Sequence, residues 1–157
     1  MAKLIVDRIK CISSTESSDD LYFLVMRFDH NCNVHRVGPN SAWAAMKNGD
    51  VRNADVVLVN NFSGEYLVAV IEEDDSFDFD QELNVRMSKG LRLLYKVTSV
   101  FEKDRGRRLA MMLFYFANMI GKERTNDDLL SVEIVNSKTE ITVLGQGSHY
   151  QITLNLV

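Results

Sequence analysis

The chain has 157 residues, of which 46% are apolar and 25% are charged, and its formal net charge is −4. This composition is typical of a soluble globular domain and excludes a disordered, collagen-like or disulfide-dense protein. A chain of this length buries enough surface on folding to hold its core without a metal ion or a disulfide. We therefore expect one domain that spans residues 1–157.

No segment has the pattern of a membrane span or a secretory signal. The longest apolar run without a charged residue, 109–121, is shorter than the roughly 20 residues that cross a bilayer. Residues 1–10 mix charged with apolar residues, unlike a signal peptide. Cys11 and Cys32 fit a reducing compartment as well as an oxidising one. We expect neither kind of segment, take the cytoplasm as the default location and leave the compartment open.

The charges are unevenly distributed along the chain. Residues 84–125 contain ten basic and three acidic residues, a net charge of +7, which leaves a net charge of −11 for the rest. The acidic part is most concentrated at residues 72–82, where seven of eleven residues are Asp or Glu. Such a segment repels itself unless it is solvated or meets cations.

Short segments rich in branched and aromatic residues, separated by turn residues, predict β-strands. They cover residues 3–12, 21–28, 55–59, 66–71, 130–135, 140–144 and 149–156. Strands of this length, divided by Gly, Asn and Ser, are typical of a sandwich or barrel. We expect a mainly β protein, an antiparallel sandwich of seven or eight strands.

The spacing of apolar residues changes in the middle of the chain and predicts two helices. Over residues 83–101 the apolar residues recur at helical spacing, beside a stripe of basic residues. After a break at residues 104–106, a second helix is expected at 107–120, apolar on nearly every face, with Gly121 as its C-cap. We expect a two-helix insertion at about residues 83–122.

Acidic residues from separate loops are candidates for a metal site. In an antiparallel sandwich the loops alternate between two ends, so the loop at residues 18–20 and the acidic loop after Ile71 fall at one end. Ca²⁺ takes six to eight oxygen ligands, which several aspartates can supply. The spacing is not that of an EF-hand, because a loop starting at Asp74 has Phe79 at its glycine position. A solvated acidic loop without metal is the alternative.

Several segments resemble bacterial C2-like β-sandwich proteins. They are LIVDRIKCISSTESSDDLYFLV, the NGD at 48–50, NFSGEYLVAVIEEDD, DDLLSVEI and GQGSHYQITLNLV. The resemblance implies a C2-like sandwich with a helical hairpin between its two halves. It also implies calcium ligands at Asp19, Asp20, Asp74, Asp80 and Asp128. With their neighbours, the expected Ca²⁺ site comprises Asp19, Asp20, Asp74, Asp78, Asp80, Asp127 and Asp128.

Two other constellations do not form a site by their spacing. His30, Cys32 and His35 are zinc-ligand types, but their spacing matches no usual structural zinc site. Ser148 and His149 are adjacent, and neighbours on a strand point to opposite faces, so they do not pair for nucleophilic catalysis. We therefore expect no enzyme.

The sequence instead favours a binding module whose helices contact an anionic membrane surface or a protein partner. The residues expected to make this contact are Lys89, Arg92, Lys96, Arg105, Arg107 and Arg108. No nucleic-acid partner is expected, because the basic segment carries no known motif for one and the rest of the chain repels phosphates. Two alternatives stay open: a structural or assembly subunit without metal, and a toxin-like protein whose hairpin inserts into lipid. The sequence leaves the oligomeric state open.

Overall fold

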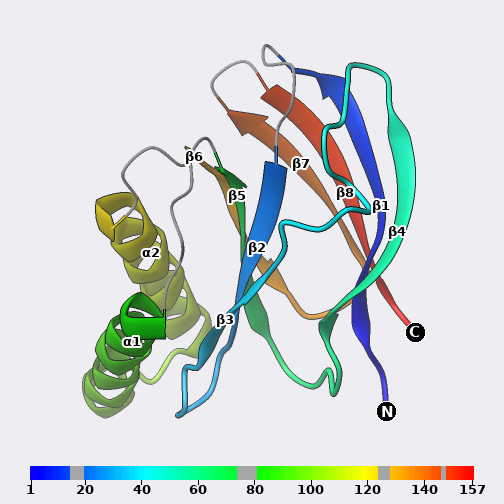
Figure 1. Ribbon diagram of the computed structural model, residues 1–157. Helices are drawn as coiled ribbons and strands as arrows, with labels where there is room; N and C mark the ends of the chain where they lie inside the picture. The colour runs from blue at the N-terminus through cyan, green and yellow to red at the C-terminus, as the bar shows by residue number, and fades with distance from the viewer. Residues whose placement is uncertain (15–19, 74–80, 124–127, 146–147) are drawn as a thin grey trace.

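The computed structural model describes residues 1–14, 20–73, 81–123, 128–145 and 148–157 (Figure 1). The described elements are β1 (Leu4–Ser13), β2 (Asp20–Arg27), β3 (Val34–Val37), β4 (Val51–Val59), β5 (Tyr66–Glu73), α1 (Gln81–Phe101), α2 (Arg105–Glu123), β6 (Asp128–Val135), β7 (Thr139–Gly145) and β8 (Ser148–Leu156). The strands form two four-stranded sheets, in the orders β4-β1-β8-β7 and β3-β2-β5-β6. Every pairing is antiparallel. The prediction of a mainly β, antiparallel sandwich with a two-helix insertion is confirmed.

The helices are inserted between two strands that are neighbours in one sheet. β5 pairs with β6 although α1 and α2 separate them in the chain. The hairpin folds back over the outer face of that sheet (Figure 1). The molecule therefore has three layers: the sheet β4-β1-β8-β7, the sheet β3-β2-β5-β6, and the helices.

The middle layer is buried on both faces, which explains the continuous apolar runs of β2 and β5. Along β2, Phe23 and Val25 face the core between the sheets, whereas Leu24 and Met26 face the helices. β5 alternates in the same way. A strand covered on both faces is apolar at every position, because neither face meets water. These runs therefore require a third layer such as the hairpin.

The core between the sheets contains the only tryptophan of the chain. The Trp43 indole is fully buried, and its Nε1 donates a hydrogen bond to the Leu21 carbonyl oxygen at 2.6 Å. Its ring meets the Phe23 ring edge-on, with 5.5 Å between centroids. Trp43 therefore reports on the packing of the sandwich.

Some element boundaries differ from those expected. β3 was not predicted, because it has four residues, of which His35 and Arg36 are polar. β4 begins at Val51 rather than near residue 55. The break between the helices covers residues 102–104, and α2 runs on to Glu123, so Gly121 does not end it. Asp104 begins α2, since its Oδ1 accepts a hydrogen bond from the Arg107 N–H at 2.9 Å, as an N-cap residue does.

Candidate functional site

The strand pairings bring acidic positions together at one end of the middle sheet. Asp20, at the start of β2, pairs with Glu73 at the end of β5. Glu72, on the same strand, pairs with Asp128 at the start of β6. Acidic residues of three adjacent strands thus occupy neighbouring backbone positions at this end, which we call the acidic end. The Glu72 residue is buried.

The other expected calcium ligands, Asp19, Asp74, Asp78, Asp80 and Asp127, lie outside the described residues. Within the described ranges, no group of three or more His, Cys, Asp or Glu side chains is placed to hold a metal ion. The strand register therefore brings Asp20 and Asp128 to one end of the sheet, and calcium binding stays a prediction.

The zinc-type residues point in different directions. Cys32 is buried in the core beneath the helices, and its thiol donates a hydrogen bond to the Asp29 carbonyl oxygen at 2.9 Å. Burial, with the nearby Asp29 carboxylate, raises the pKa of the Cys32 thiol to about 12. His35 lies on the other side, with its Nε2 2.9 Å from the Leu58 carbonyl oxygen of β4. At neutral pH the Cys32 thiol is therefore protonated, and a protonated thiol is neither a metal ligand nor a nucleophile.

Two of the six basic residues expected to contact a partner also make contacts within the molecule. Arg105 donates from Nε to the Glu65 carboxylate at 3.0 Å and lies over the Phe28 ring, 5.0 Å from its centroid. Arg108 lies over the Tyr95 ring at 4.6 Å. The Tyr95 and Phe28 rings in turn meet edge-on, 5.4 Å apart. These contacts connect the junction of α1 and α2 to the ends of β2 and β5.

The other four basic residues lie on the helices with fewer internal contacts. Arg92 is half-buried and donates from Nε to the Ser88 carbonyl oxygen at 3.2 Å. Lys89 and Lys96 are exposed, with no ion pair to another residue of the described ranges. The Arg107 side chain is 76% exposed and lies 3.9 Å from a Glu102 carboxylate oxygen. Lys89, Lys96, Arg105 and Arg107 are therefore the exposed members of the set, and Arg105 is the one of these that also pairs with the sheet side through Glu65.

The solvent-facing side of the hairpin also carries large apolar side chains. We define the outer face of the hairpin as these exposed residues together with Lys89, Lys96 and Lys103. The apolar members are Val85, Leu93, Val97, Val100, Phe101, Met111, Phe114 and Tyr115. Val100 and Phe114 are 81% and 74% exposed. Large exposed apolar side chains that gather in a patch mark interaction sites on soluble proteins.

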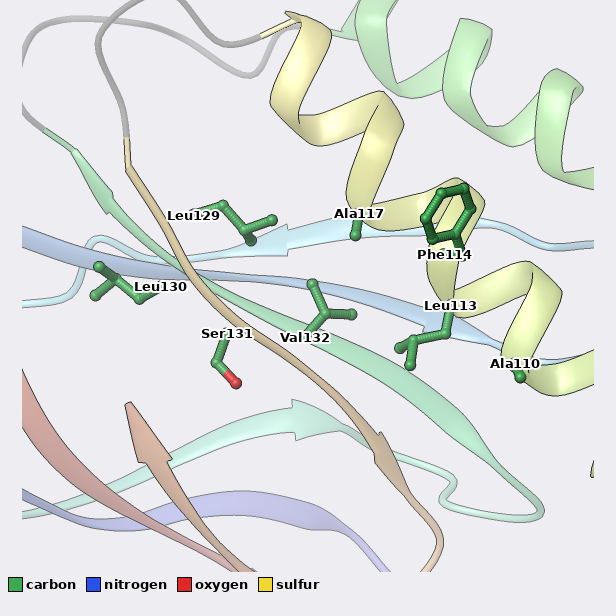
Figure 2. A pocket seen from close by; sticks show the side chains of 8 residues that line it. All are labelled: Ala110, Leu113, Phe114, Ala117, Leu129, Leu130, Ser131 and Val132. Carbon is green, nitrogen blue, oxygen red and sulfur yellow. The ribbon is translucent and has the colours of Figure 1, made fainter. Parts of the chain in front are cut away.

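A groove runs between α2 and β6 (Figure 2). It has a volume of about 510 Å³. The lining residues are Ala110, Leu113, Phe114 and Ala117 of α2 and Leu129, Leu130, Ser131 and Val132 of β6. A second hollow, of about 410 Å³, lies on the outer face against Leu94, Ala110, Met111, Phe114 and Tyr115. Sequence reasoning missed the groove, because nothing in the pattern of β6 shows that it is an edge strand beside a helix.

These features define an antiparallel β-sandwich with a helical hairpin inserted between two neighbouring strands. No protein-family model, curated protein or solved structure matches the chain. The resemblance to C2-like proteins therefore stays a prediction. In the described part of the chain, neither helix is long and apolar enough to cross a bilayer.

Proposed function

We propose that the protein is a non-enzymatic binding module that docks the outer face of its α1–α2 hairpin on an anionic membrane surface. The observation that carries the proposal is the alternation of basic and apolar residues along one stripe of α1 and the residues just after it. In order, the stripe is Lys89, Leu93, Lys96, Val100 and Lys103, and every member is exposed. The spacing of three and four residues keeps Lys89, Leu93, Lys96 and Val100 on one face of α1, and Lys103 follows the helix by two residues.

This stripe has the two chemical properties that interfacial binding uses. The apolar side chains enter the boundary between headgroups and acyl chains, while the lysines meet anionic headgroups. Each lysine near an anionic surface contributes about 1 kcal/mol of binding free energy. The opposite side of the hairpin packs on the sheet through Met87, Leu91, Met112 and Phe116, so the outer face is the side that remains for contact.

Vesicle binding tests the proposal. We expect the protein to sediment with phosphatidylserine-containing vesicles and not with phosphatidylcholine vesicles, and less so as salt rises. The double substitution Lys89→Gln, Lys96→Gln should remove about 2 kcal/mol of binding free energy, which weakens vesicle binding about 30-fold. The matched control is Lys3→Gln with Lys10→Gln, which removes the same charge from exposed lysines at the start of the chain and on β1.

Two results would contradict membrane docking. One is equal binding to both kinds of vesicle. The other is an equal loss in the helix variant and its control, because net charge rather than the stripe would then govern binding. Replacing Leu93 and Val100 by Ser tests the apolar members of the stripe separately. If that variant binds vesicles as well as the wild type does, the apolar residues take no part in the contact.

Calcium binding at the acidic end is a second candidate, favoured by the pairing of Asp20 with Glu73 and of Glu72 with Asp128. If Ca²⁺ binds there, Ca²⁺ at a hundred times its dissociation constant adds about 2.7 kcal/mol to the free energy of unfolding. At this chain length that raises the thermal midpoint by roughly 5–11 °C over EDTA, and Mg²⁺ should not reproduce the rise. Asp20→Asn should reduce the shift, whereas Asp55→Asn, on β4, should not. If the thermal midpoint does not shift at millimolar Ca²⁺, the acidic end does not bind the ion and is a solvated surface.

A further inference from the structure

We infer that the groove between α2 and β6 binds an extended peptide segment of a partner protein, which adds as a strand to the free edge of β6. The groove shares Phe114 with the outer face but does not include the stripe on α1 that contacts lipid in the proposal above. The inference rests on the position of β6 in its sheet, on the residues that line the groove, and on the charge at one end of the groove.

The lining shows that the groove follows the edge of β6 rather than one of its faces. Four successive residues, Leu129, Leu130, Ser131 and Val132, line it (Figure 2). Successive side chains of a strand point to opposite faces, so four in a row line one groove only when that groove runs along the strand's backbone. An occupant of the groove therefore lies next to the main chain of β6.

The edge of β6 is open to pairing among the described strands. β6 is the last strand of its sheet and is hydrogen-bonded only to β5. In an antiparallel pair, every second residue turns its N–H and C=O away from its partner. The pairing skips Leu130 at a bulge and is regular from Ser131 to Val135. This regular stretch can accept the main chain of another strand.

Two of the other three edge strands in the described structure carry features that discourage strand addition. β3 has only four residues. β4 pairs with β1 through two register shifts and contains Asp55 in a left-handed conformation, with φ at 51°. β7 and the regular part of β6 each carry one charged residue, Glu140 and Glu133. The apolar groove beside β6 favours it as the edge that a partner strand joins.

The walls of the groove indicate the chemistry of the peptide. On the α2 side the small Ala110 and Ala117 lie two turns apart and leave room on either side of Leu113 and Phe114 (Figure 2). Apolar side chains at alternate peptide positions would fill this space, which is how strand-adding peptides gain specificity. Arg107 lies one turn before Ala110 on the same helix face. Its exposed guanidinium favours an acidic residue at that end of the peptide.

A designed peptide tests the inference. The probe is a fluorescein-labelled octapeptide, EVTVSVTS, which begins with an acidic residue and has apolar residues at alternate positions. Its control has the same composition with the three valines consecutive. We expect saturable binding of the first peptide, measured by fluorescence anisotropy, and at least tenfold weaker binding of the second. Hydrogen exchange should slow at those amides of Ser131–Val135 that point away from β5, because strand addition makes main-chain hydrogen bonds there.

Two tryptophan variants locate the site. Ala117→Trp fills the groove and should weaken peptide binding at least tenfold, whereas Asn118→Trp, the next residue and exposed outside the lining, should change it less than twofold. If Ala117→Trp does not fold, Phe114→Ala takes its place in the binding measurement, because it removes an exposed side chain from the rim of the groove. Equal effects of Ala117→Trp and Asn118→Trp, or protection of amides elsewhere, would overturn the inference.

Self-association is the competing occupant. If the wild type dimerises in sedimentation velocity with protection of the same β6 amides, and Ala117→Trp is monomeric, then a second copy fills the groove and the peptide proposal is wrong. A monomer that binds the alternating peptide supports it.

Discussion

The packing of the hairpin on the middle sheet is tested by two phenylalanines two residues apart on α2. Phe116 is fully buried in the core beneath the helices, whereas Phe114 is 74% exposed on the outer face. Replacing each by Ala removes the same atoms from the same helix. The structure therefore predicts very different effects on the free energy of unfolding.

The expected magnitudes follow from burial. A buried Phe→Ala substitution lowers the free energy of unfolding by about 3–5 kcal/mol, because it loses apolar contacts and leaves a cavity. At this chain length each kcal/mol shifts the thermal midpoint by about 2–4 °C, so Phe116→Ala should lower it by roughly 6–20 °C. Phe114→Ala removes a side chain that already meets water and should change stability by less than about 0.5 kcal/mol.

Two probes follow the transition in urea. Far-UV circular dichroism at 222 nm reports mainly on the helices, and fluorescence of the buried Trp43 reports on the core between the sheets. If the hairpin and the sandwich form one cooperative unit, both signals should change at the same urea concentration in the wild type and in both variants.

Two results would refute this reasoning. Equal and small effects of the two substitutions would mean that Phe116 is not buried against the sheet. A circular dichroism transition in Phe116→Ala that precedes the Trp43 transition would mean that the helices unfold alone, and the three layers would not be one unit.

Two further predictions concern Cys32 and Asp104. The Cys32 thiol has a pKa of about 12 in the folded protein and about 9.0 in the unfolded chain. Between these pH values the folded state therefore binds more protons than the unfolded state. The free energy of unfolding should fall as the pH rises through this window. Urea unfolding at pH 8 and pH 10 should show a steeper loss for the wild type than for Cys32→Ala, and equal losses would contradict the assigned burial. Asp104→Ala removes the N-cap of α2 and should lower the free energy of unfolding by about 1 kcal/mol. Asp104→Asn, which keeps an acceptor oxygen, should recover much of that loss in the same urea titration, and identical losses in both variants would argue against the cap.

Alternation of apolar residues was sufficient to predict most strands, and one of its irregularities has a structural cause. In β1 the fully buried residues are Leu4, Val6, Ile9 and Cys11, so the period of two slips by one between Val6 and Ile9. Both ladders of β1 shift register at this point, which is a β-bulge. The bulge keeps both halves of the strand facing the core, and the slip in the pattern was visible in the sequence.

Features set by the arrangement of the elements were not predictable. Which strands become edges depends on the strand order, and alternation does not encode that order. For this reason the groove beside β6 was missed. The spacing of the basic residues likewise did not show that Arg105 would pair with Glu65 and Arg108 stack on Tyr95, because those partners come from other elements. Of the expected calcium ligands, Asp20 and Asp128 lie at one end of the middle sheet, because antiparallel order fixes which strand ends meet, and their role as ligands stays a prediction.

Burial of the hairpin also bears on how it meets a membrane. Leu24, Met26, Leu67 and Ile71 are buried on the face of the middle sheet that the hairpin covers. If the hairpin left the sheet for the lipid, these side chains would meet water, at a cost of about 1.5–3 kcal/mol each, or roughly 6–12 kcal/mol for the four. That is comparable with the whole stability of a typical domain, about 5–15 kcal/mol. We therefore expect the hairpin to stay on the sheet while its outer face binds lipid. The protein should then bind phosphatidylserine-containing vesicles without releasing an entrapped dye, with or without Ca²⁺. Dye release that is lost in the Lys89→Gln, Lys96→Gln variant would instead support the toxin-like alternative, in which the hairpin leaves the sheet.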